Sequence, residues 1–273
     1  MSDQRVIKLI ATYDGTDFHG FQRQKDLRTV QGELERAVSR VAGHEVGVRG
    51  SSRTDAGVHA RGLVVSFRTS AKHPIRAFDR GVNALLPEDV KIRSAEDAPD
   101  DFDARRASLG KTYRFLIWND PSANPLLRRH AWHLRPRLDL DAIQGSLADL
   151  EGAHDFTSFR AAHCDAKSTD RMMWAARWTV SDSGALHCFE ITGNAFLRNM
   201  VRIMVGSLVG IGLGRRPPGD LGRQLAALDR TQAGDTAPGH GLVLERVYLT
   251  ASALYEALGR EVEIFKPQLW PEP

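Results

Sequence analysis

Stretches with the pattern of β-strands and stretches with the pattern of helices alternate along both halves of the chain. This alternation restricts the fold more than any other feature of the sequence. In the first half, strand patterns cover residues 6–13, 63–67 and 112–118, and helical patterns cover 34–41 and 75–86. Elements mixed in this way typically build sheets that are covered by helices. We therefore predict an α+β protein.

The second half of the chain repeats the mixture. Helical patterns cover about 139–151, 195–209 and 221–228, and strand patterns cover 174–180, 186–192 and 242–250. Three prolines between residues 119 and 138 indicate a loop between the halves. A chain of 273 residues is long enough for two domains with cores of their own. We predict a first domain over residues 1–120 and a second over residues 121–273.

Several classes of protein are excluded by simple counts. The longest mostly apolar run, Ile203–Gly214, is shorter than the roughly 20 residues that a membrane-spanning helix needs. The first residues lack a charged stretch followed by an apolar core, so we expect no secretory signal. Two cysteines cannot form a disulfide framework. The pairs His163-Cys164 and His187-Cys188 are adjacent in sequence and lack the two-residue gap of common zinc sites. We therefore expect a cytoplasmic protein with no membrane association and no metal.

The charge of the chain is unevenly distributed. The net charge is only +3, yet residues 1–80 carry +5 and residues 105–137 carry +7, while residues 81–104 carry −5. The basic residues are 30 arginines and 7 lysines, and arginine binds phosphate through two parallel hydrogen bonds and stacks on bases. GC-rich coding produces the same bias, and charged stretches are often solvated faces. Composition alone therefore leaves nucleic-acid binding open.

The densest group of chemically active residues lies between Gly50 and Arg61, where Asp55 stands among small residues, with Arg53 before it and His59 after it. Glycine lets the backbone approach a ligand closely, arginine attracts phosphate, and a carboxylate can attack covalently or handle a proton. An isolated Asp-x-Gly is more often a type I turn, and a single histidine is more often a hydrogen-bonded core residue. This segment also carries arginines and a histidine, which a type I turn does not require.

Three further residues have two interpretations each. Tyr113 lies inside a predicted strand and would by default fill the core. Arg198 and Arg202 are four residues apart on an otherwise apolar helical pattern. They mark either its solvated face or a buried charge with a carboxylate partner.

A glycosidase would need a second carboxylate opposite Asp55, and no dinucleotide or phosphate-loop motif is present.

The segment Arg53-Thr54-Asp55-Ala56-Gly57-Val58-His59-Ala60 resembles the active-site motif of the tRNA pseudouridine synthase A (TruA) family. Four other segments resemble family motifs in the family's order, and together the matches span roughly residues 5–250. These segments are Tyr13–Gln22, Lys111–Arg114, Gly193–Arg202 and Ala237–Leu242. One departure is Ser52, which stands where the family commonly has glycine.

The resemblance implies a role for each matched residue. Asp55 is similar to the family's nucleophile, and Arg202 to the arginine that pairs with it and keeps it ionised. Tyr113 is similar to the tyrosine that stacks on the uracil and is a candidate base for the final proton. Arg53 would help to displace the target base. Two more residues would line the uracil pocket, namely Gly241 and Leu242.

The resemblance also implies the activity and the fold. Members of the family isomerise uridine to pseudouridine at positions 38, 39 and 40 of the tRNA anticodon stem-loop, a redox-neutral reaction that needs no cofactor. Their fold has two α/β subdomains with mixed, largely antiparallel sheets that flank a basic cleft, and they assemble as homodimers. By this resemblance the first domain carries Asp55 and Tyr113, the second carries Arg202, and the cleft receives tRNA.

Two other functional classes follow from the residues with less support. A non-catalytic RNA-binding protein on the same scaffold would bind tRNA without needing a nucleophile such as Asp55. A glycoside hydrolase would need a carboxylate, instead of an arginine, opposite Asp55. The chemical path also stays open, because Asp55 can attack ribose C1′ or uracil C6, or can permit loss of the C2′ proton.

Overall fold

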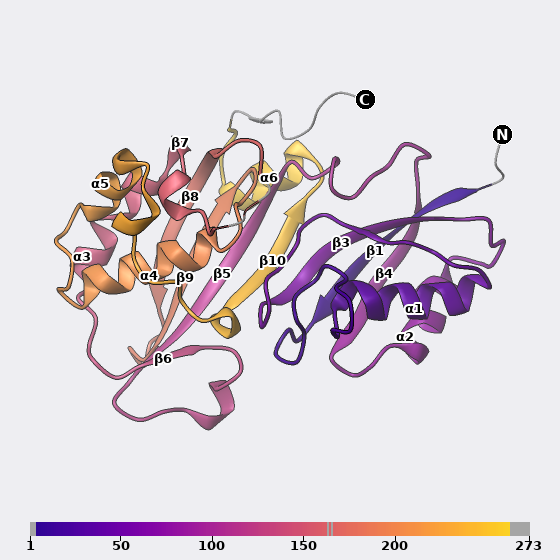
Figure 1. The fold of residues 1–273 in the computed structure, drawn as a ribbon, viewed down its shortest axis with the longest axis horizontal. Coiled ribbons are helices and arrows are strands. Elements are labelled where there is room, and N and C mark those ends of the chain that lie inside the picture. The colour runs from indigo at the N-terminus through magenta and orange to yellow at the C-terminus, as the bar shows by residue number, and fades with distance from the viewer. Residues whose placement is uncertain (1–3, 163, 165, 263–273) are drawn as a thin grey trace. The chain divides into compact units, whose positions relative to one another are not determined.

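A computed structural model describes residues 4–162, 164 and 166–262 of the chain (Figure 1). The chain forms two compact units. The first unit comprises Met1–Ser108 and Val243–Val247, and the second comprises Leu109–Leu242 and Tyr248–Pro273. Within the described residues, no helix has the length and apolar character needed to span a membrane.

The first unit is built on an antiparallel sheet in the order β4 (Val90–Ala98), β1 (Arg5–Tyr13) and β3 (His59–Thr69). The short strand β2 (Arg49–Gly50) pairs antiparallel with β3. The strand β10 (Leu242–Tyr248) pairs parallel with the start of β3. The strands predicted over residues 6–13 and 63–67 are therefore confirmed, and β3 is longer than its pattern indicated.

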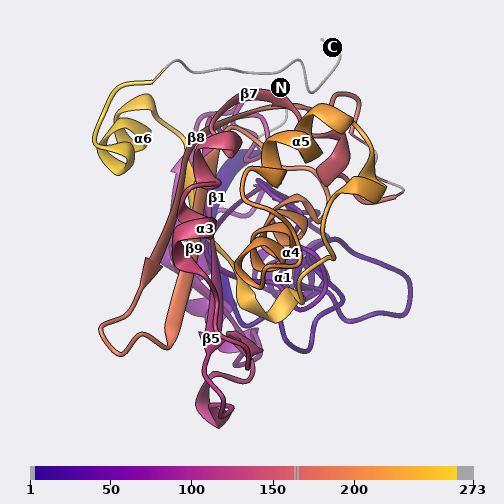
Figure 2. The same ribbon diagram turned by 90° about the vertical axis from the view of Figure 1, so that its left-hand side faces the viewer.

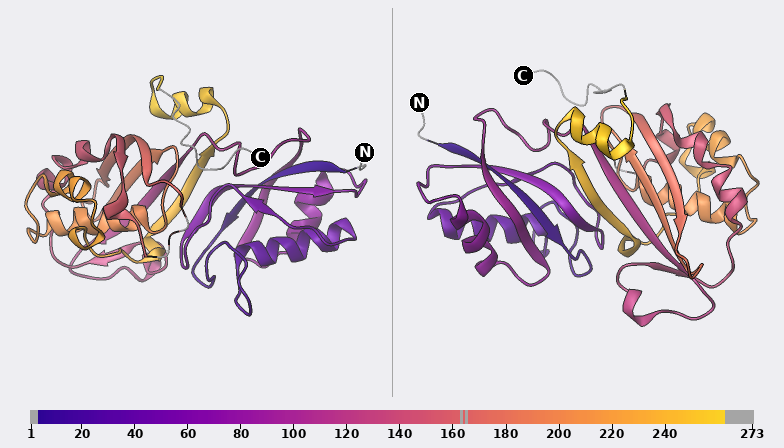
Figure 3. Two further views of the ribbon diagram at one scale, coloured as in Figure 1. Left: turned by 45° about the horizontal axis from the view of Figure 1, so that its top comes forward. Right: turned by 180° about the vertical axis from the view of Figure 1, so that it is seen from behind.

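Two helices, α1 (Val30–Ala42) and α2 (Val82–Leu85), cover one face of this sheet (Figures 1 and 3). The side chain of Thr29 caps α1 by accepting a hydrogen bond from the backbone of Gly32, and α1 ends at Gly43, whose φ is 75°. The apolar positions of α1 recur at helical spacing and face the core. The helix predicted over 75–86 is present as a π-helical turn followed by α2.

The second unit has an antiparallel sheet whose strand order is β5 (Gly110–Asn119), β9 (Leu186–Gly193), β8 (Asp170–Val180) and β7 (Gly152–Asp155). The short strand β6 (Trp132–Leu134) pairs parallel with β5. The strands that the sequence predicts over 112–118, 174–180 and 186–192 are all confirmed. With the parallel pairs of β6 and β10, the sheets are mixed and largely antiparallel, which confirms the predicted α+β class.

Helices cover both faces of the second sheet (Figure 2). One face carries α3 (Leu140–Gln144), α4 (Met200–Gly212) and α5 (Asp220–Ala227), and the opposite face carries α6 (Ala251–Leu258). Nearly every residue of α4 is buried, which makes it the central helix of this unit. The apolar side of α6 packs on Trp174 and Tyr248.

The structure departs from the sequence-based prediction at two helices. The helix predicted from residue 195 begins only at Met200, because Asn199 adopts a left-handed conformation with φ of 62° and the side chain of Asn194 binds the backbone amides of Met172 and Ala195. The helix predicted over 139–151 is split into α3 and a 3₁₀ turn over Leu147–Leu150. Local periodicity does not report such interruptions.

The two units are divided between Ser108 and Leu109, whereas the sequence predicts a boundary after residue 120. The reason is the pairing of β5, which is in register with β9 from Lys111 to Trp118. This pairing binds the whole strand to the second unit. Tyr113 therefore belongs to the second unit, together with α4.

Candidate active site

The first group of predicted site residues lies on the loop between β2 and β3. Asp55 is half-buried and follows the exposed Arg53 by two positions. The backbone turns directly after Asp55, where its carbonyl accepts a hydrogen bond from the amide of Val58 at 3.2 Å and Gly57 has φ of 76°. Only glycine adopts that φ without strain. The turn expected from the Asp-x-Gly pattern is thus present, and it presents the carboxylate at a bend.

Backbone hydrogen bonds join this loop to the segment that follows β1. The amide of Phe21 donates to the carbonyl of Thr54 at 3.0 Å, and the amide of Gly57 donates to the carbonyl of Phe18 at 3.3 Å. A Cβ atom on Gly20 would lie 2.7 Å from the Thr54 oxygen, so the two segments touch through backbone. The sequence singled out both segments as motifs, and the structure brings them together.

Buried side chains form further hydrogen bonds that hold this loop. The hydroxyl of Tyr13 and that of Thr54 form a buried hydrogen bond of 2.8 Å. His59, with 4% of its surface exposed, accepts a hydrogen bond at Nδ1 from the amide of Gly15 at 3.0 Å and lies 3.1 Å from a carboxylate oxygen of Asp14. His59 is thus a hydrogen-bonded core residue, the default interpretation of its sequence position. Its contacts hold the loop that carries Asp55.

The second group of predicted residues lies in the other unit. Tyr113 is on β5 with 6% of its surface exposed, and its ring meets the ring of Phe196 edge-on, with 5.0 Å between centroids. Aromatic pairs favour this arrangement. Because Phe196 lies in the segment that leads into α4, the contact joins β5 to that segment.

The structure distinguishes the two arginines that the sequence left equivalent. Arg198 precedes α4 and is exposed, whereas Arg202 lies in the first turn of α4 and is half-buried. The Arg202 guanidinium donates from Nε to the carbonyl of Ala237 at 2.7 Å and from Nη1 to the side-chain oxygen of Asn199 at 3.0 Å. The amide of Ala237 returns a hydrogen bond to the carbonyl of Arg202 at 3.1 Å. Arg202 is therefore held in one orientation.

The closing motif is tied to the same unit. Gly241 ends a 3₁₀ turn, and a Cβ atom there would lie 2.5 Å from the ring of Phe115, so only glycine fits. Leu242 follows it, buried at the start of β10. Burial lowers the pKa of His240, with smaller contributions in the same direction from His130 and Arg202. His240 is a neighbour of Arg202 to which the sequence assigned no role, although it stands inside the quoted motif.

The six predicted residues thus form two groups, one in each unit. Arg53 and Asp55 belong to the first unit. The others share the second unit and are Tyr113, Arg202, Gly241 and Leu242. A carboxylate at a braced turn can act as a nucleophile or a base. A fixed guanidinium can stabilise negative charge, and a largely buried phenol can stack on a base or transfer a proton.

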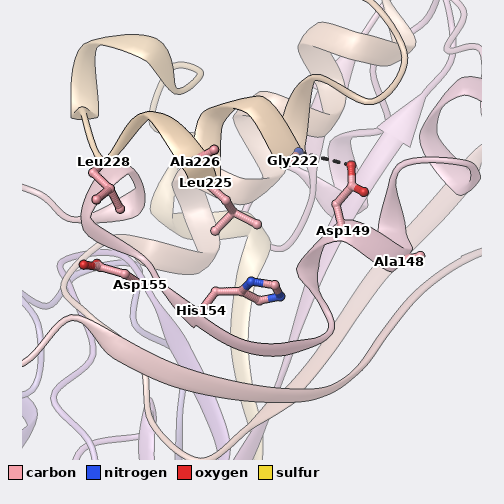
Figure 4. A pocket seen from close by; sticks show the side chains of 8 residues that line it. All are labelled: Ala148, Asp149, His154, Asp155, Gly222, Leu225, Ala226 and Leu228. Carbon is pink, nitrogen blue, oxygen red and sulfur yellow. Dashed lines mark hydrogen bonds between the residues drawn. The ribbon is translucent and has the colours of Figure 1, made fainter.

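A pocket of about 360 Å³ lies elsewhere in the second unit, between α5 and β7 (Figure 4). The carboxylate of Asp149 lies at its edge and accepts a hydrogen bond from the amide of Gly222 at 3.1 Å. His154, Asp155 and Leu225 also line it. None of the predicted site residues lines this pocket, so it is separate from the candidate active site.

Comparison with known proteins points to one family. The family model described as tRNA pseudouridine synthase matches residues 9–105 and 147–248. The chain is 41% identical over 244 residues to tRNA pseudouridine synthase A of Ruminiclostridium cellulolyticum, which covers 89% of this chain and 99% of the relative. It is 44% identical over 242 residues to tRNA pseudouridine synthase A of Syntrophotalea carbinolica, with 89% and 95% covered.

Among solved structures, the chain is similar to one from the Nop10-Cbf5 complex of the archaeal box H/ACA sRNP. The TM-score is 0.36 and the sequence identity is 13%, over 74% of this chain and 44% of that chain. The chain therefore spans less than half of the length of that structure.

Proposed function

Because the chain belongs to the tRNA pseudouridine synthase family, we propose that it isomerises uridine at positions 38, 39 and 40 of the tRNA anticodon stem-loop, with Asp55 as the nucleophile. The observation that carries this proposal is the bracing of the Asp55 loop by the segment after β1. A nucleophile must be held in a productive geometry, and backbone hydrogen bonds on both sides of Asp55 supply that restraint.

In the reaction, the bond between ribose C1′ and uracil N1 breaks, the uracil turns over, and a bond forms between C1′ and C5. The hydrogen on C5 leaves as a proton, and a proton joins N1, so atoms and electrons balance without an oxidant or reductant. The Asp55 carboxylate can start this sequence at C1′, at C6 or through the C2′ proton. No cofactor is required by the chemistry.

The other residues have roles in the same proposal. Arg202 pairs with Asp55 and keeps it ionised, and its fixed guanidinium suits that role. Tyr113 stacks on the uracil and is a candidate for removing the final proton. Gly241 and Leu242 form the wall of the uracil pocket, where Gly241 leaves no room for a side chain.

The target uridine must leave its stack before it can react, which costs a few kcal/mol. Arg53 is exposed beside Asp55 and suits the displacement of the base. The segment after β5 is also basic, with four exposed arginines and Asp120 as its only acidic residue up to Leu138; the arginines are Arg128, Arg129, Arg135 and Arg137. Contacts of these groups to phosphates supply affinity without reading sequence. We further propose a cytoplasmic homodimer, in line with the family resemblance.

The experiment is release of tritium from unmodified tRNA that carries 5-tritiated uridine, since formation of the C1′–C5 bond expels that hydrogen. The wild type is expected to release tritium, and Asp55→Asn is expected to lose at least about a thousandfold in rate while still binding tRNA. Asp101→Asn removes the charge of an exposed aspartate in the same unit and serves as the control. Binding without release by the wild type would identify an RNA-binding protein instead. An active Asp55→Asn variant would refute the nucleophile.

A further inference from the structure

Two segments of the first unit that are far apart in sequence converge on Ser66 of β3. Arg49 of β2 is the register partner of Ser66. The buried hydroxyl of Ser66 accepts a hydrogen bond from the amide of Ala104 at 3.0 Å. The loop that leads from Arg49 to Asp55 and the turn around Ala104 are therefore anchored at the same point of the sheet.

A single carboxylate joins the two segments. One oxygen of Asp103 accepts the amides of Arg105 at 2.9 Å and Arg106 at 3.1 Å, and the other pairs with Nη1 of Arg49 at 3.0 Å. Although burial acts in the opposite direction, the pKa of Asp103 lies below its ordinary value because of these partners. Asp103 is thus an ionised anchor that fixes Arg49 and the backbone of the turn.

The guanidinium groups around this anchor repel one another. Burial lowers the pKa of Arg105, and the positive charges of Arg53 and Arg49 lower it further, while Asp103 opposes them. The group remains protonated at neutral pH, because an arginine guanidinium is not deprotonated in proteins. Arg49, Arg53 and Arg105 are all exposed. The charges of Arg53 and Arg49 act on Arg105, and a cluster of guanidinium groups of this kind attracts anions.

We propose that Arg49 and Arg105, together with Arg53, form a binding site for one phosphodiester group of the RNA backbone. Guanidinium forks match the oxygens of phosphate in pairs. Arg53 stands two residues before Asp55, so the phosphate belongs to the strand that carries the target uridine. This inference rests on the proposed function, and it adds Arg49 and Arg105, which lie outside the matched motif.

The test measures binding of unmodified tRNA by fluorescence anisotropy over a range of salt concentrations. Arg49→Gln and Arg105→Gln are each expected to weaken binding roughly three- to tenfold and to reduce the slope of log K against log salt by about one. In steady-state assays the loss should appear in KM. Arg40→Gln, at an exposed position in the last turn of α1, removes the same charge outside the cluster and should match the wild type.

Two further variants test the same site, one that removes a negative charge and one that keeps a positive charge but changes its shape. Asp103→Asn keeps an acceptor for the two amides but removes the negative charge, so the slope of log K against log salt should rise. Arg105→Lys retains the charge without the fork, so the slope should stay near the wild-type value while affinity falls. Circular dichroism at the assay temperature checks that each variant is folded.

The possible outcomes distinguish failure of the phosphate site from failure of the proposed function. If the wild type releases tritium but Arg49→Gln and Arg105→Gln bind tRNA like Arg40→Gln, the phosphate site is refuted while the proposed function stands. If the wild type releases no tritium, the proposed function fails. Inorganic phosphate, tested at constant ionic strength, should not displace tRNA at millimolar levels. Phosphate that binds alongside tRNA without displacing it, in the wild type but not in Arg105→Gln, would identify a site for free phosphate and overturn the assignment to RNA.

Discussion

The side-chain oxygen of Asn199 accepts a hydrogen bond of 3.0 Å from Nη1 of Arg202, one helical turn further along the chain. Asn199 occupies the cap position of α4, yet its side chain does not cap the helix, and its φ of 62° is left-handed. Asparagine tolerates that conformation better than most residues. The residue therefore turns the chain into α4 and at the same time orients the arginine.

Two substitutions at Asn199 separate its role in turning the chain into α4 from its role in orienting Arg202. Asn199→Gly keeps the left-handed backbone without strain but removes the hydrogen bond, so we expect near-wild-type stability and a clear fall in kcat. Asn199→Ala adds a strained backbone, costing roughly 1–2 kcal/mol in the free energy of unfolding. Thermal unfolding and tritium release measure both effects. Full activity of the glycine variant would show that Arg202 needs no help from Asn199.

Removal of the arginine itself should have a larger effect. Arg202→Met is expected to lower turnover by roughly a hundredfold or more, because it removes the charge proposed to keep Asp55 ionised. The acid limb of the pH–rate profile should also move to higher pH. Arg198→Met, at the exposed arginine just before α4, is the matched control and should leave turnover unchanged. Equal rates for Arg202→Met and the wild type would mean that the proposed pair does not form.

The hydroxyl and the ring of Tyr113 can be tested apart. Tyr113→Phe retains the contact with Phe196 and should fold and bind tRNA normally, while turnover falls roughly a hundredfold if the hydroxyl transfers a proton. Tyr113→Ala removes a largely buried ring and should lower the free energy of unfolding by roughly 3 kcal/mol. Normal turnover of Tyr113→Phe would leave stacking as the only role of the residue.

The buried hydrogen bond between Tyr13 and Thr54 is expected to couple stability to catalysis. Tyr13→Phe leaves a buried hydroxyl without this partner and should cost roughly 1–2 kcal/mol in the free energy of unfolding. Because Thr54 adjoins Asp55, kcat should fall as well. A double-mutant cycle with Thr54→Val measures the coupling. Additive effects of the two substitutions would contradict an interaction between these hydroxyls.

The stability of the second unit should depend on pH through His187. Its Nδ1 accepts a hydrogen bond from the indole of Trp178 at 3.2 Å, and its Nε2 donates to the carbonyl of Gly184 at 3.1 Å, so the ring is neutral. Burial lowers the pKa of His187. The unfolded chain therefore binds the proton more readily, and stability is fully present above the unfolded pKa of about 6.5 and is lost as the pH falls below it.

Thermal unfolding measured from pH 8 to pH 5 tests this expectation. The melting temperature of the wild type should fall below about pH 6.5, and His187→Gln should flatten that fall. His73→Gln replaces an exposed histidine and should leave the pH dependence unchanged. A wild-type melting temperature that rises toward acid would contradict the assignment of a neutral ring.

Local features of the sequence were enough to predict much of the fold and the first half of the site. Strand-like residue patterns predicted β1, β5, β8 and β9, because such a pattern is a property of the segment itself. The turn at Asp55 followed in the same way from Asp-x-Gly, since the left-handed φ at Gly57 requires glycine there.

Other features were decided only by tertiary structure. Tyr113 belongs to the second unit because β5 pairs with a strand far along the chain. Arg202 and Arg198 look alike in sequence, and only the contact with Ala237 and the left-handed turn at Asn199 make Arg202 the oriented one.

The convergence of Arg49 and Arg105 on Asp103 has no signature in the sequence, because 54 positions separate Arg49 from that carboxylate. Periodicity and motifs report the preferences of one segment, whereas burial, register and the meeting of charges depend on which distant segments pack together. The sequence by itself therefore determined the chemistry available to this protein, and the tertiary structure decided which side chains are oriented to perform it.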